Sequence, residues 1–330
     1  MSFKFSFTES SDYKERYWVL QTIVVLIFIG LAARAFYLQI LDKEFLRKQG
    51  DARMVRSEVI NAHRGMIMDR NGVPLAVSTP VTSIWINPKE IFELAHPPQE
   101  ENPKKQKQPV FLDYNAIASA IGIEPNELRS KVEANPKKEF MYLKRHLAPD
   151  VAKVILEREF PAVYGINEYH RYYPQGEATA HVIGFTDLDD KGREGVELAF
   201  DKSLTGISGL QRVIKDRKGR KVKDVMQLRP AKAGQDIYLS FDARVQYIAH
   251  RELAKAVQEH EAEAAYLVAI DVKTGEILAM VSYPNFENNR FSRLIPAYYY
   301  DQLSQDPRKP LLNNAIQAEY PPGSTFKLST

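Results

Sequence analysis

The sequence predicts an α+β multidomain protein with a single N-terminal transmembrane helix. Three observations lead to this prediction. A long uncharged apolar run lies near the N-terminus, strand-like and helix-like patterns alternate through the middle of the chain, and a Pro-Pro-Gly-Ser-Thr-Phe-Lys segment stands close to the C-terminus. The chain has 330 residues and is 44% hydrophobic, which suffices for globular cores in about two or three domains.

The composition restricts the classes of function. Lysine and arginine total 45 against 42 acidic residues, so the formal charge of +3 does not indicate a nucleic-acid partner, and none is predicted. The chain contains no cysteine, which excludes cysteine catalysis and thiolate metal sites. Because disulfides are then impossible, cysteine usage does not distinguish a cytosolic from an extracytoplasmic protein. No cofactor and no metal are predicted.

The apolar run from Trp18 to Ala33 carries no charge, and apolar character resumes after Arg34 as far as Leu41. Together these residues are long enough for the roughly 20 that a helix needs to cross a bilayer. A buried helix of a soluble protein and a cleaved signal peptide are the alternatives. The hydrophobic part of a signal peptide is usually about 7–15 residues, and this run continues past the small-residue triplet Ala33-Arg34-Ala35, so an uncleaved anchor is favoured.

The charges that flank the anchor give a weak signal for orientation. More basic residues follow the run than precede it, which taken alone would place the C-terminal side in the cytoplasm. Long domains translocate largely regardless of flanking charge. We therefore expect the bulk of the chain to lie outside the cytoplasm.

The region after the anchor is expected to be rich in strands. Residues 42 to 57 have an amphipathic helical pattern, Ser57 to Asn61 alternate as a strand, and Val81 to Asn87 form another. Between them the Asn-Gly pair in Asp69 to Gly72 predicts a β-hairpin turn. The charged residues of this segment, Arg64, Asp69 and Arg70, are interpreted as solvated turn or ion-pair residues.

The next stretch predicts a small α/β subdomain. Residues Pro97 to Pro109 are expected to be an exposed loop, Asn115 to Ala134 two short helices separated at Pro125, and Pro149 to Phe160 a further helix. Strand-rich character returns from Tyr169 to about Thr186. This last segment contains His170 and His181, which have no partner at metal-ligand spacing and are interpreted as structural histidines.

Two further features precede the C-terminal module. A short helix is expected from Val196 to Leu204 and a hairpin from Val213 to Val222. The hairpin tip, Asp216 to Arg220, is basic enough to contact an anionic polymer or phosphate headgroups. A simply solvated tip is the favoured interpretation.

The C-terminal module has a strand–helix–hairpin pattern. Gly234 to Phe241 is expected to be a strand, Asp242 to cap a helix that runs through Glu259, and Ala264 to Ile270 and Ile277 to Ser282 to pair as a hairpin. The candidate core positions of the helix are Val245, Ile248, Leu253 and Val257. The Lys273-Thr274-Gly275 triplet is interpreted as the hairpin turn.

Ser324 and Lys327 form the candidate catalytic pair. Pro321, Pro322 and Gly323 stop any incoming helix, so a helix is expected to begin at Ser324. Lys327 then follows at i+3 on the same face, where its amine could take the proton of the serine hydroxyl. A second Ser-x-x-Lys match, Ser11 with Lys14, lies in a polar N-terminal tail and is not expected to be catalytic.

Six segments in one order resemble the class B penicillin-binding proteins. They are the anchor, HRGMIMDRNGVPLA, YHRYYPQGEATAHVIGF, GREGVELAFDKSLTG with DRKGR, DVKTGEILAMVSYP, and PPGSTFK. Segments 53 to 90 and 136 to 225 are most similar to the septal type, penicillin-binding protein 3. Residues 308 to 325 look more like the elongation type, penicillin-binding protein 2.

The resemblance implies an elongated β-rich pedestal with a small α/β head, followed by the start of a penicillin-binding transpeptidase domain related to serine β-lactamases. The expected division is a cytoplasmic tail at 1–16, an anchor at 17–41, a pedestal at 42–233 with the head insertion at about 88–165, and the N-terminal part of the transpeptidase domain at 234–330. The expected location is the bacterial inner membrane, with one span and the bulk of the chain in the periplasm.

The resemblance also implies a serine-type D-Ala-D-Ala transpeptidase that crosslinks peptidoglycan at the division septum. Ser324 would be the nucleophile and Lys327 the general base. The implied partners are stem peptides, the lipid-linked precursor glycan, β-lactams, a SEDS-family glycosyltransferase of the FtsW or RodA type, and divisome or elongasome membrane proteins.

One departure from the family pattern concerns the rest of the active site. The family's Ser-x-Asn box is missing, and no Lys-Thr-Gly follows Ser324. The sequence is therefore expected to be a fragment that is inactive by itself. The alternatives are an elongation-type transpeptidase, a non-catalytic membrane-anchored scaffold, and a β-lactam sensor.

Overall fold

The computed structural model describes residues 12–37, 55–97, 108–215, 221–293, 295 and 297–319. The chain divides into two units, one made of residues 1–57 with 212–225 and the other of 58–211 with 226–330. Helices and strands occur together, and one N-terminal helix is apolar. The prediction of a mixed α and β protein with one apolar N-terminal helix is thus confirmed.

Helix α1 (Asp12–Phe36) belongs to the first unit. Its segment Trp18–Phe36 has a mean hydropathy of 2.2, and none of it is buried against protein. Among the described residues it is the one helix long and apolar enough to cross a membrane. The part of the predicted anchor beyond Tyr37 lies outside the described residues.

Three strands, β1 (Val55–Ile60), β6 (Gly209–Lys215) and β7 (Lys221–Arg229), form a sheet in the order β1-β6-β7. The predicted strand at 57–61 and the predicted hairpin at 213–222 are confirmed. The hairpin tip at 216–220 and residues 42–54 lie outside the described residues. The expected helix is wrong for residues 55–57, because the alternating, β-branched sequence there pairs with β6 instead.

The second unit contains a five-stranded sheet. Its strands are ordered β4-β3-β2-β8, and β5 pairs with β3. The strands are β2 (Ile67–Met68), β3 (Pro74–Ile86), β4 (Met141–Leu147), β5 (Val163–Tyr172) and β8 (Ile237–Tyr238). The β2–β3 hairpin confirms the predicted turn, in which Gly72 has a φ of +81° and Asp69 Oδ1 accepts the backbone N–H of Val73 at 2.7 Å.

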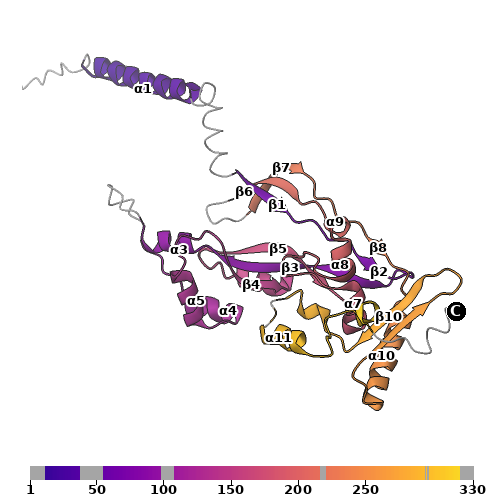
Figure 1. The fold of residues 1–330 in the computed structure, drawn as a ribbon. Helices are drawn as coiled ribbons and strands as arrows, with labels where there is room; N and C mark the ends of the chain where they lie inside the picture. Colours follow the sequence, from indigo (N-terminus) through magenta and orange to yellow (C-terminus); the bar gives the residue numbers. More distant parts are fainter. Residues whose placement is uncertain are drawn as a thin grey trace, which may run out of the picture. The chain divides into compact units, whose positions relative to one another are not determined.

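Short helices cover one face of this sheet, and Figure 1 shows α4 and α5 beside β4. Ile84 and Ile86 of β3 pack in a buried cluster with Ile117 of α4, Leu128 of α5 and Ile155 of α6. The predicted pair of helices separated at Pro125 is confirmed, as is the helix that begins at Pro149. The helices are α3 (Pro88–Ala95), α4 (Tyr114–Ile121), α5 (Pro125–Glu133) and α6 (Pro149–Leu156).

The segment after β5 is helical rather than strand-rich. It contains η3 (Gly176–Thr179), α7 (Ala180–Ile183), α8 (Gly195–Ala199) and α9 (Asp201–Leu204). The expected strand at 180–185 is wrong, because Ala180 and Ile183 are buried at helical i, i+3 spacing. The short helix expected at 196–204 is present as two consecutive turns.

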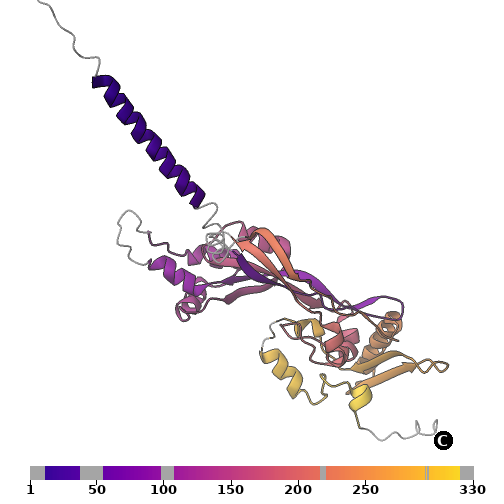
Figure 2. The same ribbon diagram turned by 90° about the horizontal axis from the view of Figure 1, so that it is seen from above.

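The C-terminal part of the second unit has α10 (Ala243–Glu259) beside a hairpin of β9 (Ala265–Ile270) and β10 (Ile277–Tyr283), as Figure 2 shows. Asp242 caps α10 through the backbone N–H groups of Arg244 and Val245, as predicted. The Lys273-Thr274-Gly275 triplet lies in the hairpin turn, also as predicted, where Gly275 N–H donates to the Asp271 carbonyl. The remaining elements are η4 (Asn288–Arg290), α11 (Ala297–Gln305) and α12 (Asn314–Gln317).

The predicted core face of α10 is partly wrong. Val257 is buried, but Val245 and Ile248 are 37% and 51% exposed. The helix instead buries Gln246, whose amide donates to the carbonyls of Ala178 and Met280 and accepts the Met280 N–H. A polar residue occupies the core position because all of its hydrogen-bonding groups find backbone partners there.

Candidate functional site

The predicted catalytic pair, Ser324 and Lys327, lies outside the described residues, as does Ser11 of the second Ser-x-x-Lys match. The described chain extends to Glu319. The structure therefore describes the segment that precedes Ser324 in the sequence, as far as Glu319.

Helix α12 holds that leading segment against β10. Asn314 is buried, and its backbone N–H donates to Ser282 Oγ of β10 at 3.3 Å. Upstream, His181 Nε2 lies 2.8 Å from the carbonyl oxygen of Pro310, so this ring nitrogen carries the proton and donates. Burial lowers the pKa of His181, which favours this neutral ring. The last described residues before Ser324 thus include a helix that lies beside β10.

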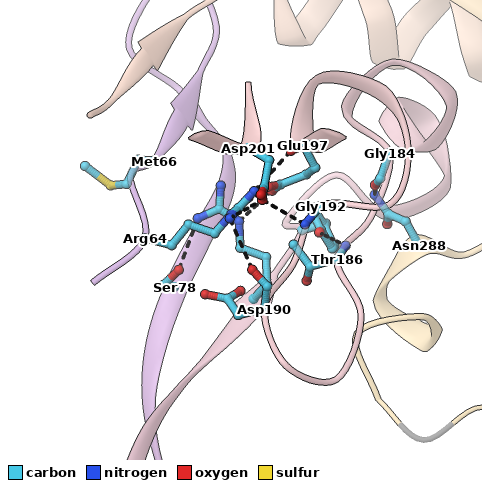
Figure 3. A network of polar contacts seen from close by, with 12 residues as sticks. Arg64, Met66, Ser78, Gly184, Thr186, Asp190, Gly192, Glu197, Asp201 and Asn288 are labelled. Carbon is cyan, nitrogen blue, oxygen red and sulfur yellow. Dashed lines mark hydrogen bonds and ion pairs between the residues drawn. The ribbon is translucent and has the colours of Figure 1, made fainter. Parts of the chain in front are cut away.

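A cluster of polar residues is buried in the same unit (Figure 3). Arg64, Arg171 and Glu197 are each no more than 1% exposed. Arg64 Nε donates to Glu197 Oε2 at 2.8 Å, and Arg171 Nε donates to Glu197 Oε1 at 2.6 Å. One carboxylate therefore bridges two guanidinium groups. We call these three residues the arginine–glutamate junction.

Further contacts satisfy most of the remaining guanidinium hydrogens of Arg64, whereas Arg171 Nη2 is buried without a hydrogen-bond partner among the described residues. Arg64 donates to the Asp190 carbonyl at 3.1 Å and to Thr205 Oγ1 at 2.8 Å, and it forms an ion pair with Asp201 at 2.8 Å. Arg171 donates to Ser78 Oγ at 3.1 Å. Burial lowers the pKa of Arg64, but the nearby carboxylates of Glu197 and Asp190 outweigh this effect, and the pKa is raised. The cation thus remains charged inside the protein.

The junction joins three segments that are far apart in the sequence. Arg64 precedes β2, Arg171 lies on β5, and Glu197 lies on α8. In the α7–α8 connection, two glycines lie in close contact with the backbone of the segment that carries Glu197. Gly184 has a φ of +76°, and a Cβ there would lie 2.0 Å from the Glu194 carbonyl oxygen. A Cβ at Gly192 would lie 2.0 Å from the carbonyl oxygen of Glu197 itself, so only glycine fits at both positions.

A second junction connects the β2–β3 turn to α10. Asp69 Oδ2 accepts the backbone N–H of Ala243 at 3.0 Å, and Asn71 Nδ2 donates to Asp242 Oδ2 at 3.0 Å. Burial raises the pKa of Asp69, but the N–H donors of Ala243, Val73 and Asn71 outweigh it, and the pKa is lowered. The Asp69 carboxylate therefore stays ionised and joins the hairpin to the first turn of α10.

These contacts correct the interpretation of the charged residues near the hairpin. Arg64 and Asp69 are not solvated, since each is 1% exposed, although Arg64 does form ion pairs. Arg70 is partly exposed and pairs with Glu276 at 3.0 Å, as the ion-pair interpretation expected.

The sequence reasoning missed Arg171 and Glu197 altogether. A usable signal was present, because Glu197 stands between apolar residues in the segment GVELA, which is typical of a buried face. His170, the residue before Arg171, is buried against His146 with ring centroids 4.5 Å apart. Within the described ranges, no three histidine, aspartate or glutamate side chains are grouped so that they could hold a metal ion.

The arginine–glutamate junction is suited to holding segments together rather than to catalysis. Its charges are paired and withdrawn from solvent, and it offers no nucleophile. Chemistry at a serine requires a base and an accessible hydroxyl, and within this chain that pairing is predicted at Ser324 and Lys327.

Comparison with known proteins gives matches along most of the chain. The family model of the penicillin-binding protein dimerisation domain matches residues 59–239. The family model of the penicillin-binding protein transpeptidase domain matches residues 265–330. Arg64, Arg171 and Glu197 all fall in the first range, and Ser324 and Lys327 in the second.

Curated relatives agree with the family models. The chain is 38% identical over 312 residues to the peptidoglycan D,D-transpeptidase FtsI of Escherichia coli K12, covering 94% of this chain and 49% of the relative. It is equally identical to the probable peptidoglycan D,D-transpeptidase PbpC of Pseudomonas aeruginosa, with 94% and 50% covered. A third relative, the probable peptidoglycan D,D-transpeptidase PenA of Neisseria meningitidis, is also 38% identical. The chain thus spans about half the length of these relatives.

The dimerisation-domain match covers more than half of the chain, and transpeptidase-domain sequence follows it, so the chain belongs to the penicillin-binding protein family.

Proposed function

We propose that the protein carrying this chain is a serine D,D-transpeptidase that crosslinks peptidoglycan stem peptides. One observation carries the proposal. The stretch that matches the transpeptidase domain contains Ser324 and Lys327 in the segment Pro-Pro-Gly-Ser-Thr-Phe-Lys, with a helix breaker directly before the serine. The relatives named above are called peptidoglycan D,D-transpeptidases.

The proposed chemistry is acyl transfer in two steps. Lys327 takes the hydroxyl proton of Ser324, and the serine oxygen attacks the penultimate D-alanine carbonyl of a stem peptide. The peptide bond breaks, the terminal D-alanine leaves with a proton, and an ester to Ser324 remains. The amine of a neighbouring stem peptide then attacks the ester, loses a proton and forms the crosslink. The backbone N–H of Ser324 at a helix N-terminus would stabilise the oxyanion in both steps.

The same site would bind β-lactams, which resemble the D-alanyl-D-alanine end and acylate the same serine. The Ser-x-Asn box is not among the 330 residues, and no Lys-Thr-Gly follows Ser324. We therefore propose that acylation needs residues beyond these 330 and that this chain alone is not acylated at a useful rate.

We further propose a single-pass location in the bacterial inner membrane. Helix α1 would be the span, residues 1–16 the cytoplasmic tail and 17–41 the anchor. Residues 42–233 would form a periplasmic pedestal with a head at about 88–165, and the transpeptidase domain would begin at 234. The buried junctions at Glu197 and Asp69 support a rigid connection within residues 58–259, which a pedestal requires.

The proposed role is at the division septum, beside a SEDS-family glycosyltransferase of the FtsW or RodA type and other membrane proteins of the divisome. The relative named FtsI supports the septal choice. The elongation-type enzyme remains the second candidate, because residues 308–325 are more similar to that type. Depletion in the source cells separates the two, since filaments indicate septation and round cells indicate elongation.

Transpeptidation can be tested with the full gene product, its glycan polymerase and lipid-linked precursor. Crosslinked stem peptides, detected by mass spectrometry after digestion of the glycan, are expected with the native protein and not with Ser324→Ala. A protein that is acylated by penicillin but makes no crosslinks would instead be a β-lactam sensor. A protein that does neither would be a scaffold.

A further inference from the structure

A pocket of about 420 Å³ lies beside the arginine–glutamate junction, on the side of Asp190 and Asp201. Its volume falls in the range of about 300–1,000 Å³ that is typical of small-molecule sites. Every residue that lines it belongs to the second unit. Neither the sequence motifs nor the transpeptidase chemistry uses this pocket.

The lining is polar but carries no strong net charge. Three cations, Arg64, Arg145 and Lys191, face four carboxylates, those of Glu168, Asp189, Asp190 and Asp201. Such a balance does not favour a polyanion or a polycation. The neutral polar residues Asn61, Thr205 and Ser208 complete this polar lining.

Ion pairs hold several of these groups in place, but some of their polar atoms have no hydrogen-bond partner among the described residues. Arg145 pairs with Asp189 at 2.9 Å and with Glu168 at 3.4 Å. Arg145 Nε and Asp190 Oδ1 are nevertheless buried without a hydrogen-bond partner. Both atoms belong to residues that line the pocket, although each atom is itself buried within the protein.

An aromatic wall faces the polar groups. The guanidinium of Arg145 lies 4.4 Å from the ring centroid of Tyr142, and the Tyr142 hydroxyl donates to Glu168 at 2.7 Å. Tyr169 forms a second part of the wall, and its ring contacts His63 edge-on. Polar side chains fixed by ion pairs beside aromatic rings suit a ligand with a polar edge and an apolar face.

Tyr142 also begins a row of rings that leads out of the pocket. Its ring contacts Phe140 edge-on, with the ring centroids 4.7 Å apart. The ring centroid of Trp85 lies 4.7 Å from that of Phe140 and 4.8 Å from that of Tyr164. Tyr142 and Tyr164 are the cross-strand neighbours of Trp85 on β4 and β5, so these three side chains share one face of the sheet. Phe140 and Tyr142 are 42% and 36% exposed. We call these four residues the aromatic row.

We propose that the pocket and the aromatic row together bind a short stretch of a neutral, linear polysaccharide. One sugar would occupy the pocket against Tyr142, and the following sugars would lie along the row. Sugars match both features, because their hydroxyls donate and accept hydrogen bonds and their C–H groups pack against the exposed edges of the aromatic rings. That this polysaccharide is the glycan strand of peptidoglycan rests on the proposed function, whereas the sugar site itself does not.

The chain provides its own reporter for this binding. It contains two tryptophans, Trp18 in α1 and Trp85 in the aromatic row. In a Trp18→Phe background, tryptophan emission therefore reports on the row alone. The experiment titrates the full chain in detergent with a β-1,4-linked N-acetylglucosamine tetrasaccharide and, as a comparison ligand, with D-alanyl-D-alanine.

The expected result is a saturable change in Trp85 emission with the tetrasaccharide and none with the dipeptide. Tyr142→Ala should weaken binding by about tenfold, the effect of losing one ring contact. Ser208→Tyr, which fills the pocket without removing an ion pair, should weaken it at least as much. Tyr247→Ala, which removes an exposed tyrosine of α10, is the matched control and should leave the affinity unchanged.

The proposal is overturned if the tetrasaccharide causes no saturable change, or if it binds equally well to the native chain and to both pocket variants. Circular dichroism of each variant shows whether it is folded, and Ser208→Tyr decides the matter if Tyr142→Ala does not fold. The measurement involves no acylation. A failure of Ser324 chemistry would therefore leave a positive result standing.

Discussion

Arg64 and Glu197 lie 133 positions apart in the chain and form a fully buried ion pair, with Arg64 Nε 2.8 Å from Glu197 Oε2. The other oxygen of the same carboxylate accepts Arg171 at 2.6 Å. A buried cation is tolerated only when it is paired and hydrogen-bonded. Glu197 therefore decides whether the segments that carry the two arginines stay together.

Glu197→Gln should destabilise the second unit strongly. The amide removes the negative charge, which leaves the buried Arg171 without its carboxylate partner and Arg64 paired with Asp201, at a cost of about 3–5 kcal/mol. Urea unfolding followed by circular dichroism measures this cost. The matched control is Glu133→Gln, which breaks an exposed i, i+4 pair with Arg129 and should cost about 0.5 kcal/mol or less. Equal effects of the two substitutions would show that the junction does not hold the fold together.

Tyr173→Phe tests a buried hydrogen bond near the junction. The Tyr173 hydroxyl oxygen accepts the backbone N–H of Thr186 at 2.9 Å, and both residues are fully buried. Removing the oxygen leaves this buried N–H group without a hydrogen-bond partner, which lowers the free energy of unfolding by about 1–3 kcal/mol. The control is Tyr172→Phe at the neighbouring, 44% exposed position, where little change is expected. The prediction fails if the Tyr173 variant unfolds at the same urea concentration as the native chain.

Gly184→Ala should prevent correct folding of the α7–α8 connection. The new methyl group would lie 2.0 Å from the Glu194 carbonyl oxygen, at a φ of +76°. Left-handed strain and the steric clash together are expected to cost at least about 3 kcal/mol. Gly72→Ala shares the positive φ, +81°, but has open space around the new atom, so it isolates the strain at about 1–2 kcal/mol. The comparison uses thermal unfolding of both variants, and a Gly184→Ala chain as stable as Gly72→Ala would contradict it.

Local sequence patterns predicted most of the elements of this fold. The Asn71-Gly72 hairpin, the break at Pro125 and the Asp242 cap each depend on the chemistry of a few adjacent residues, and all three are confirmed. The failures have a different origin. Gln246 takes the core position of α10 because backbone groups from η3 and β10 satisfy its amide, and no pattern within the helix contains that information.

The buried charges were missed for the same reason. Arg64 looked solvated because its partners, Glu197 and Asp201, are more than a hundred residues away. A single sequence records the charge of each residue but not which residues meet. The candidate catalytic pair is the opposite case, because the breaker, the serine and the lysine are adjacent and their pattern can be recognised locally.

The carboxyl group of Asp190 should make the free energy of unfolding fall as the pH rises. Burial raises the pKa of its carboxyl to about 6, against the opposing attraction of Arg64 and Arg171. The folded chain then holds this proton more tightly than the unfolded chain, whose aspartate has the ordinary pKa of 3.8. The free energy of unfolding is thus unaffected by this group below about pH 4, falls between about pH 4 and 6, and stays lowered above that.

Asp190→Asn tests this sign. Asparagine tolerates the left-handed backbone at this position, where φ is +62°. Relative to the native chain, the variant should gain up to about 3 kcal/mol of stability between pH 4 and pH 7.5, the equivalent of a pKa difference of about two units. Urea midpoints of both chains at the two pH values give the comparison. A difference between the two chains that does not change with pH would contradict the prediction.

The central claim is that Ser324 is the acylated nucleophile. The most direct test is labelling of the full gene product, in membranes, with a fluorescent penicillin. The native protein and the control Ser11→Ala, which removes the second Ser-x-x-Lys match, should label equally. Ser324→Ala should not label at all, and Lys327→Gln should label at least about a hundredfold more slowly, as expected for loss of a proton acceptor. Undiminished labelling of Ser324→Ala would contradict the account.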